Sequence, residues 1–244
     1  MSGGIKKYLQ ALADFFLPRA CIVCSKRLEI SEKHICRDCL EDMPRTYNWN
    51  IPHNPMADKY NDKIQQNISQ APVREDYQYA VALFFYRSGY KFVTQALKYK
   101  GNIPSGRYFA SQLASVIASS PLYSDVDMIV PVPLHYTRKW RRGYNQAEII
   151  ASEIASNLGV QMNSSLLYRS RRTRTQTTLG QDQRAANVSG AFAVKNPPAE
   201  APHHILIVDD VFTTGATIAE CHKALRSVLG PSVRISAATL AFVE

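Results

Sequence analysis

The residues best suited to chemistry lie in one run, which reads Ile-Leu-Ile-Val-Asp-Asp-Val-Phe-Thr-Thr-Gly-Ala-Thr from Ile205 to Thr217. Its four leading apolar residues predict a short strand buried on both faces, which is typical of a parallel sheet. Two adjacent carboxylates, Asp209 and Asp210, follow the strand, and a hydroxyl-rich turn then leads into a helix predicted from about 217 to 225. Ligands of open α/β sheets bind at the carboxyl ends of strands, where a turn entering a helix directs backbone N–H groups at an anion.

The residue types of this run suit a sugar phosphate. Threonine hydroxyls can donate hydrogen bonds to phosphate oxygens, and Gly215 permits a positive φ and a close backbone approach. The two carboxylates can accept hydrogen bonds from a vicinal diol, but they would repel a bare polyphosphate. A ribose 5-phosphate meets both conditions. The predicted contacts are Asp209, Asp210, Val211, Thr213, Thr214, Gly215, Ala216 and Thr217.

This run resembles the phosphoribosyl pyrophosphate (PRPP) motif of type I phosphoribosyltransferases, although Phe212 is bulkier than the aliphatic residue usual there. The alternative is a strand whose acid pair binds Mg²⁺ or caps the helix, as in other doubly wound folds. The thirteen-residue pattern favours the PRPP motif because it is far more specific than an acid pair alone. The resemblance implies that Asp209 and Asp210 act in catalysis and that Mg²⁺ accompanies the pyrophosphate.

A second basic stretch follows another predicted strand, Met128 to Pro133, and precedes a helix predicted to end near Gly159. In type I phosphoribosyltransferases the loop after the first core strand holds the pyrophosphate of PRPP, and this stretch has that place in the order of elements. His135 is also an acid–base candidate, although we favour a role in positioning the loop. The candidate contacts are the backbone amides at Leu134 and His135 and the side chains of Arg138, Arg142, Asn145 and Gln146.

A third stretch, residues 169–184, is basic, rich in hydroxyls and almost devoid of core residues. Its place between two predicted strands favours a lid over an anionic ligand, and a basic linker is the alternative. Expulsion of pyrophosphate passes through an oxocarbenium-like state that must be kept from water, and cations in a lid neutralise the leaving group. We therefore predict Arg172 as a catalytic residue, and as lid residues Arg171, Arg174, Thr175 and Gln176.

Four cysteines near the amino end form two Cys-x-x-Cys pairs separated by eleven residues: Cys21, Cys24, Cys36 and Cys39. Each pair offers two thiolates to one ion, and two pairs complete the tetrahedron that structural zinc prefers. Disulfides are the alternative, which paired motifs in a chain expected to be cytoplasmic disfavour. We predict a closed structural zinc site with His34 at the surface. Three roles stay open for this module: bracing the neighbouring domain, forming a dimer or contacting nucleic acid.

Composition and charge limit the classes of function. No apolar run reaches the ~20 residues needed to cross a bilayer, so we predict no transmembrane segment. Residues 8–17 are predicted to form an amphipathic helix rather than a signal peptide. The 244-residue chain has a net charge of +9, of which residues 131–184 contribute +6 through nine basic and three acidic side chains. Such a cluster suits a pyrophosphate, a nucleic-acid backbone or both.

We divide the chain into residues 1–45, an amino-terminal helix and zinc module, residues 46–76, a connector or hood, and residues 77–244, a phosphoribosyltransferase-like domain. Prolines and scattered apolar residues predict an irregular segment over 42–72. Beyond it the patterns predict strands at 77–86 and 165–168 and helices at 88–97 and 107–119. Lys98 and Lys100 could reach a ligand phosphate, although solvation of a helix end explains them equally well.

Taken in order, these motifs resemble the ComF family of competence-associated proteins. The matching segments are the four cysteines, Lys98 to Asn102, Val130 to His135, Arg142 to Ala147, the Arg/Thr/Gln-rich stretch and Asp209 to Thr217. The resemblance implies a type I phosphoribosyltransferase fold, which is an α/β fold with a mostly parallel sheet flanked by helices, and an added zinc module. It also implies import of single-stranded DNA during natural transformation, with a DNA-uptake helicase or translocase as partner.

Two classes of function stay open. One is a transferase that moves the phosphoribosyl group from PRPP to an unidentified acceptor. The other is a catalytically silent PRPP sensor or a nucleic-acid-binding accessory protein, which would use the basic segment 138–174 and stacking by Tyr136, Trp140 or Tyr144. Glutamine-dependent amination is not supported, because cysteines 21–39 are assigned to a metal and no glutaminase domain is present.

Overall fold

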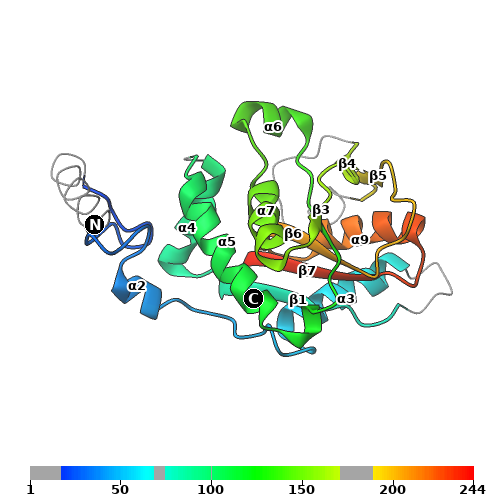
Figure 1. The fold of residues 1–244 in the computed structure, drawn as a ribbon, viewed down its shortest axis with the longest axis horizontal. Coiled ribbons are helices and arrows are strands. Elements are labelled where there is room, and N and C mark those ends of the chain that lie inside the picture. The colour runs from blue at the N-terminus through cyan, green and yellow to red at the C-terminus, as the bar shows by residue number, and fades with distance from the viewer. Residues whose placement is uncertain (1–17, 69–74, 100, 171–188) are drawn as a thin grey trace.

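A five-stranded parallel sheet forms the centre of the computed structural model, which describes residues 18–68, 75–99, 101–170 and 189–244. The strands lie in the order β1-β7-β6-β2-β3, so the strand that carries the acid pair, β6, is central (Figure 1). Burial on both faces is expected for a parallel sheet, and β1, β2 and β7 are almost continuously buried. The strand bounds are β1 Ala80–Phe85, β2 Met128–Pro131, β3 Gln161–Met162, β6 His204–Phe212 and β7 Arg234–Phe242.

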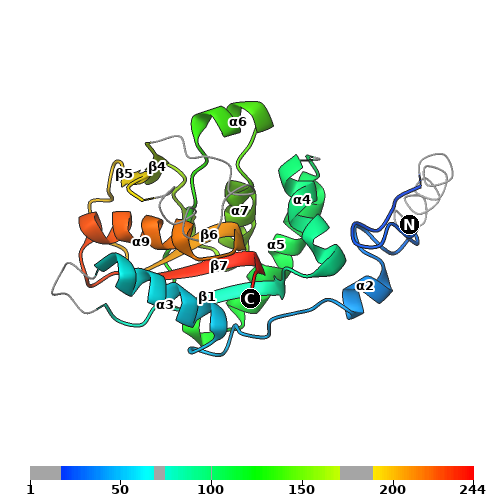
Figure 2. The same ribbon diagram turned by 180° about the vertical axis from the view of Figure 1, so that it is seen from behind.

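Helices cover both faces of this sheet (Figures 1 and 2). On one face α5 (Ile103–Ala118) packs against α7 (Gln146–Leu158) and α4 (Lys91–Tyr99). On the other face α3 (Pro55–Ile68) packs against α9 (Ala216–Leu229). Each face has its own apolar core. The predicted α/β fold, a parallel sheet flanked by helices, is therefore confirmed.

Shorter elements surround the sheet, and two of them differ from the sequence predictions. The strand predicted at 165–168 is β4 (Leu167–Arg169), which pairs antiparallel with β5 (Phe192–Val194) in a separate two-stranded sheet. The main sheet ends instead at β3, whose two residues are too few to show a period. The remaining short elements are α2 (Arg37–Glu41), α6 (Tyr136–Arg142), and the 3₁₀ turns η1 (Ser88–Tyr90) and η2 (Pro121–Tyr123).

The prediction of an irregular segment over 42–72 was wrong for α3. Met56, Tyr60 and Ile64 recur every four residues on one helical face and are fully buried. Asn54 caps this helix, because its Oδ1 accepts hydrogen bonds from the N–H groups of Met56 and Ala57 at 3.1 and 3.0 Å. The apolar stripe is narrow among many polar residues, which hid its period. The proposed division at 45/46 and 76/77 stays a prediction.

Candidate functional site

A pocket of about 450 Å³ opens at the carboxyl ends of the parallel strands. The residues that follow β1, β2 and β7 line it, and the last four residues of β6 form its floor. This is the position that the strand-end rule for open α/β sheets predicts. The lining residues from these strand ends are Tyr86, Val132, Pro133, Leu134, Asp209, Asp210, Val211, Phe212 and Val243.

The acid pair lies inside the pocket with one cation beside it. Asp210 is 5% exposed and Asp209 is half-buried, and the Asp210 N–H donates to Asp209 Oδ1 at 2.8 Å. Burial and the adjoining Asp210 carboxylate raise the pKa of Asp209 to about 7, and the Lys98 ammonium only partly offsets them. Asp209 therefore holds a proton near neutral pH more readily than an isolated aspartate does.

Lys98 reaches the acid pair from the last turn of α4. Its Nζ lies 2.7 Å from Asp210 Oδ2, and its side chain is 29% exposed. Burial alone would lower the pKa of Lys98, but the carboxylates of Asp210 and Asp209 together raise it above its ordinary value. Lys98 is therefore a cationic residue in the wall of the pocket, and its contact with a ligand phosphate stays a prediction. Lys100 lies outside the described residues.

The turn after β6 is shaped by Gly215. Its φ of +77° lies in the left-handed region, and a Cβ built there would be 2.6 Å from Phe212 Cζ. Only glycine tolerates both the positive φ and the close contact with the ring, so the bulky Phe212 requires a glycine at position 215. Thr213 and Thr217 line the pocket, and α9 begins at Ala216, so the positive end of its dipole borders the same space.

The loop after β2 is fastened to α7 by one side chain. Asn145 Oδ1 accepts a hydrogen bond from the Ala147 N–H at 3.1 Å, and its Nδ2 donates to the Val132 carbonyl at 3.0 Å. Gln146 is 3% exposed and lines the pocket, and its Nε2 has no hydrogen-bond partner among the described residues. A buried amide nitrogen without a partner can donate a hydrogen bond to a ligand oxygen.

His135 does not line the pocket. It is buried and caps α6, with Nδ1 2.9 Å from Thr137 Oγ1. This arrangement is that of a residue that positions the loop. Thr214 similarly serves the turn, because its Oγ1 accepts a 3.5 Å hydrogen bond from the Ala216 N–H.

The pocket brings together most of the predicted ligand residues. They are Asp209, Asp210, Val211, Thr213, Gly215, Thr217, Leu134, Arg142 and Gln146. Four others, His135, Asn145, Thr214 and Ala216, support these positions without lining the pocket. Arg138 belongs to α6, but its side chain lies outside the described part of the chain. The predicted catalytic Arg172 and the lid residues Arg171, Arg174, Thr175 and Gln176 also lie outside the described residues.

Four lining residues with polar or charged side chains were not named as site residues in the sequence analysis: Tyr86, Tyr99, Arg141 and Arg169. Tyr86 could have been found, since it follows the carboxyl end of β1 and neighbouring parallel strands end at one edge. Arg169 was predicted only as the first residue of the basic stretch 169–184, whereas it ends strand β4 of the small β4–β5 sheet, which no local pattern predicted.

The four predicted cysteines meet at one point. Their Sγ atoms all lie within 4.8 Å of one another, and Cys24 Sγ is 3.7 Å from Cys36 Sγ. Zinc–sulfur bonds of about 2.3 Å in a tetrahedron require sulfurs about 3.8 Å apart, so the donor set fits this ion. No disulfide joins these cysteines. His34 is not part of the cluster, and its ring packs 5.6 Å from that of Tyr108.

The cysteine module packs against the α/β domain through η1. A Cβ at Gly89 would lie 2.8 Å from Val23 Cγ1, so the two segments are in close contact. The Tyr90 hydroxyl donates to the Cys39 carbonyl at 2.7 Å. Cys21 and Cys36 are part of the same apolar cluster as Phe84. These contacts are those of a brace, one of the three roles considered for the module.

Fold and site together define an α/β protein with a carboxylate-bearing strand-end pocket and a four-cysteine module. The chain is 26% identical over 221 residues to Competence protein F of Haemophilus influenzae, covering 89% of this chain and 94% of that protein. It is 28% identical over 165 residues to Competence protein ComFC of Bacillus subtilis, covering 65% of this chain and 62% of that protein. It is also 40% identical over 99 residues to DNA utilization protein YhgH of Escherichia coli K12.

The match to YhgH spans 41% of this chain and 43% of that relative. No protein-family model matches the chain. The competence-protein relatives match most of the chain and the four cysteines cluster as predicted, so these findings agree with the resemblance to the ComF family. Within the described ranges, every helix is too short or too polar to cross a membrane.

Proposed function

We propose that this protein binds PRPP with Mg²⁺ in the strand-end pocket and works as a phosphoribosyltransferase-like protein in DNA uptake. One observation carries the proposal. A single pocket of about 450 Å³ has two carboxylates in its floor, a threonine–glycine turn at a helix N-terminus, and Arg142 and Gln146 in its wall. That arrangement matches a ligand with a diol at one side and anionic groups at the others.

Each part of PRPP has its counterpart in this pocket. Asp209 and Asp210 would hold the ribose diol, and the turn that contains Thr213 and Thr217 would hold the 5-phosphate. The pyrophosphate would lie along the loop at Leu134, beside Arg142 and Gln146. Mg²⁺ would neutralise the pyrophosphate charge. We further propose that residues 171–176, with Arg172 at the leaving group, cover the bound ligand.

Thermal unfolding with PRPP and Mg²⁺ tests the proposal. A ligand at ~100 times its Kd stabilises the folded chain by about 2.7 kcal/mol, which amounts to a rise of several degrees in Tm. The double change Asp209→Asn with Asp210→Asn should abolish that rise. Asp62→Asn, on the exposed face of α3, is the matched control and should keep it. An unchanged wild-type Tm at saturating PRPP would contradict the proposal.

Turnover needs a separate measurement, because the pocket explains binding but not transfer. Incubation with PRPP and a mixture of cell metabolites, followed by assay of pyrophosphate release, distinguishes the two. Release that depends on the metabolites supports a transferase. Binding without any release supports the alternative, a catalytically silent PRPP sensor or accessory protein.

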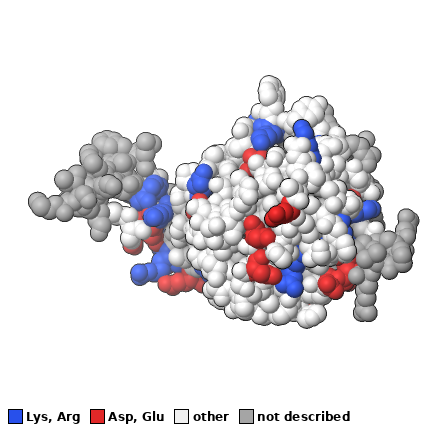
Figure 3. Space-filling view, turned by 45° about the vertical axis from the view of Figure 1, so that its right-hand side comes forward, with Lys and Arg blue, Asp and Glu red and all other residues white. Residues whose placement is uncertain are grey.

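A nucleic-acid contact is proposed on α6, which projects from the body of the molecule (Figure 1). Trp140 is 88% exposed and Tyr136 is 75% exposed, on a helix that also carries Lys139, Arg141 and Arg142. Figure 3 shows Lys and Arg side chains at the top of the molecule, where α6 projects. Exposed aromatic rings among cations suit the stacked bases and phosphates of a single strand.

Fluorescence anisotropy with an oligothymidylate tests this contact. Trp140→Ala should weaken binding about tenfold, since base stacking contributes ~1–3 kcal/mol per base. Removal of the charges at Arg171, Arg172 and Arg174 should also weaken it, and affinity should fall with salt. An affinity that changes neither with salt concentration nor with any of these substitutions would refute the nucleic-acid role. A DNA-uptake helicase or translocase as partner is part of the same proposal.

The cysteine cluster is proposed to hold one structural Zn²⁺. Four thiolates leave no open coordination position, so the ion would stabilise the module rather than react. Elemental analysis should find one zinc per chain, and Cys36→Ser should lose it. Zinc content that survives this change would contradict the assignment. Sedimentation analysis of the same pair tests whether the module also supports a dimer.

A further inference from the structure

A second hollow, of about 250 Å³, adjoins the PRPP pocket at the carboxyl end of α4. Four residues line both spaces, so the two are continuous: Lys98, Tyr99, Arg141 and Arg142. Gly101 and Tyr144 complete the hollow. None of the groups assigned above to the diol or the 5-phosphate lines it. Arg142, which we placed beside the pyrophosphate, borders both spaces, so the room for a second molecule lies around Tyr99, Arg141 and Tyr144.

The charge of the side chains that line the hollow favours an anionic ligand. Three of its lining side chains are cationic and none is acidic. Lys98 has its counter-charge in the first pocket, at Asp210. Within the described ranges, neither Arg141 nor Arg142 forms an ion pair, whereas Lys139 on the same helix pairs with Glu148 at 2.9 Å. Two neighbouring guanidinium groups without a carboxylate are well suited to a phosphate.

The tyrosine rings that line the hollow also favour a ligand with a planar group. Tyr99 is 64% exposed, and the Arg142 guanidinium carbon lies 5.6 Å from its ring centroid. The arginine occupies one side of the ring and fixes its orientation, so a second planar group can stack on the exposed side. Tyr144 is held in place because its hydroxyl donates to the Leu97 carbonyl. A ligand that joins an aromatic ring to a phosphate meets both conditions.

We propose that this hollow binds a nucleotide, with its base on Tyr99 and its phosphate on Arg141 and Arg142, and presents it as the acceptor to the adjoining pocket. The acceptor role rests on the proposed PRPP binding, whereas the nucleotide binding does not. In transfer, a nitrogen or oxygen of the nucleotide forms a bond to C1 of PRPP as the C1–O bond to pyrophosphate breaks. The bonding pair leaves with the pyrophosphate, which also carries away the proton of the acceptor.

Calorimetric titration with thymidine 5′-monophosphate tests the site, because this probe lacks the vicinal diol that the acid pair would grip. We expect the wild type and the Asp209→Asn/Asp210→Asn variant to bind it equally. Tyr99→Ala and Arg141→Gln should each bind it about tenfold more weakly, the loss expected from one stacked base or one charge-assisted contact. Lys63→Gln is the control for lost charge, since Lys63 lies on α3, outside both hollows, and its Nζ donates to Gln66 on the same helix. Thymidine alone and inorganic phosphate alone should bind more weakly than the nucleotide.

The outcomes separate this inference from the proposed function. Competition between the nucleotide and PRPP, together with loss of nucleotide binding in the double Asn variant, would place the nucleotide in the ribose-phosphate pocket and overturn the inference. Failure of PRPP to bind while the nucleotide still binds through Arg141 would overturn only the acceptor role. A 5′-phosphorylated pentathymidylate distinguishes the two sources of the ligand. Tighter binding than the mononucleotide, weakened by Trp140→Ala, identifies the end of a single strand, and equal binding identifies a free nucleotide.

Discussion

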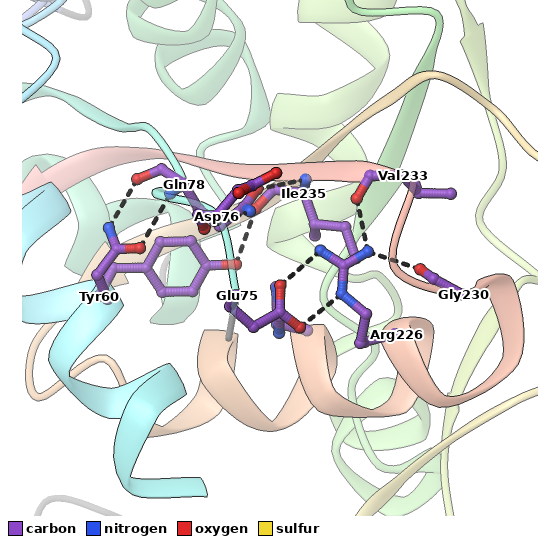
Figure 4. A network of polar contacts seen from close by, with 10 residues as sticks. Tyr60, Glu75, Asp76, Gln78, Arg226, Gly230, Val233 and Ile235 are labelled. Atoms are coloured by element: carbon purple, nitrogen blue, oxygen red, sulfur yellow. Dashed lines mark hydrogen bonds and ion pairs between the residues drawn. The ribbon is translucent and has the colours of Figure 1, made fainter. Parts of the chain in front are cut away.

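Two buried ion pairs connect distant parts of this chain, and they differ in how completely they are satisfied. Arg226 on α9 donates to both carboxylate oxygens of Glu75 at 2.6 and 2.8 Å, and to the carbonyls of Gly230 and Val233 at 2.6 and 2.7 Å (Figure 4). Its side chain is 13% exposed and that of Glu75 is 5% exposed. The pair ties the chain before β1 to the turn between α9 and β7.

The Lys98–Asp210 pair has one ionic contact and an open side. Asp210 Oδ2 lies 2.7 Å from Lys98 Nζ, and no other described residue donates a hydrogen bond to it. A second carboxylate, Asp209, adjoins it, and the pocket lies in front of both. A fully hydrogen-bonded pair fixes the fold, whereas an incompletely satisfied pair at a pocket has capacity left for a ligand. We therefore expect the first pair to serve stability and the second to serve the proposed ligand binding.

The largest effect is expected from breaking the first pair. Arg226→Met leaves Glu75 buried without its partner and should lower the free energy of unfolding by about 3–5 kcal/mol. Urea unfolding measures this. Arg107→Met, which removes one side of the exposed Arg107–Glu153 contact at 3.4 Å, is the control and should cost less than about 1 kcal/mol.

The double variant Glu75→Gln/Arg226→Met sharpens this result. It removes the uncompensated charge as well, so it should recover part of the stability that Arg226→Met loses. Equal instability of the single and double variants would mean that Arg226 acts through its carbonyl contacts alone. In that case the contrast between the two pairs would fail.

The parts of the site whose residues are consecutive in the sequence could be predicted from it. Strand β6, the acid pair and the turn at Gly215 are consecutive, and burial, carboxylates and backbone freedom each leave a local pattern. The four cysteines were equally predictable, because metal geometry restricts their spacing. Gly215 shows the limit of this approach. Its need for a positive φ was predictable, but its contact with Phe212 was not.

Contacts made by the fold itself could not be predicted. Glu75 and Arg226 are 151 residues apart, and neither lies in a pattern that indicates the other. Charge patterning could not distinguish Lys98 from an ordinary helix-end cation, and only the packing of α4 brings it to Asp210. Helix α3 was missed because its apolar stripe is narrow and lies among many polar residues. In each case the information lies in tertiary packing rather than in local spacing.

The second prediction concerns the pH dependence of the pocket. The pKa of Asp209 is raised in the folded chain to about 7 from an ordinary 3.8, so the folded state keeps a proton that the unfolded state has lost. Asp209 thus contributes stability at low pH, and this contribution disappears as the pH rises from about 4 to about 7. Above pH 7 it changes no further. The slope within this window is on the order of 1 kcal/mol per pH unit.

Asp209→Asn removes this titration. The difference in unfolding free energy, variant minus wild type, should therefore increase from pH 4 to pH 7 and then level off, as urea unfolding at several pH values would show. Asp62→Asn is the matched control for loss of a carboxylate. A difference that stays constant across the window would mean that Asp209 is not held as an acid by the pocket.

The smallest effect on stability, and the clearest separation of the two pairs, is expected at Lys98. Lys98→Met should lower the unfolding free energy by less than Arg226→Met does, because the acid pair can take up a proton when its counter-charge is removed. The same change should weaken PRPP binding about tenfold, the loss of one charge-assisted contact to an anionic ligand. Lys91→Met, at the start of the same helix and outside both pockets, should leave PRPP binding unchanged. If Lys98→Met instead destabilised the chain as much as Arg226→Met and left PRPP affinity intact, Lys98 would be a structural residue, and the open side of its ion pair would have no bearing on binding.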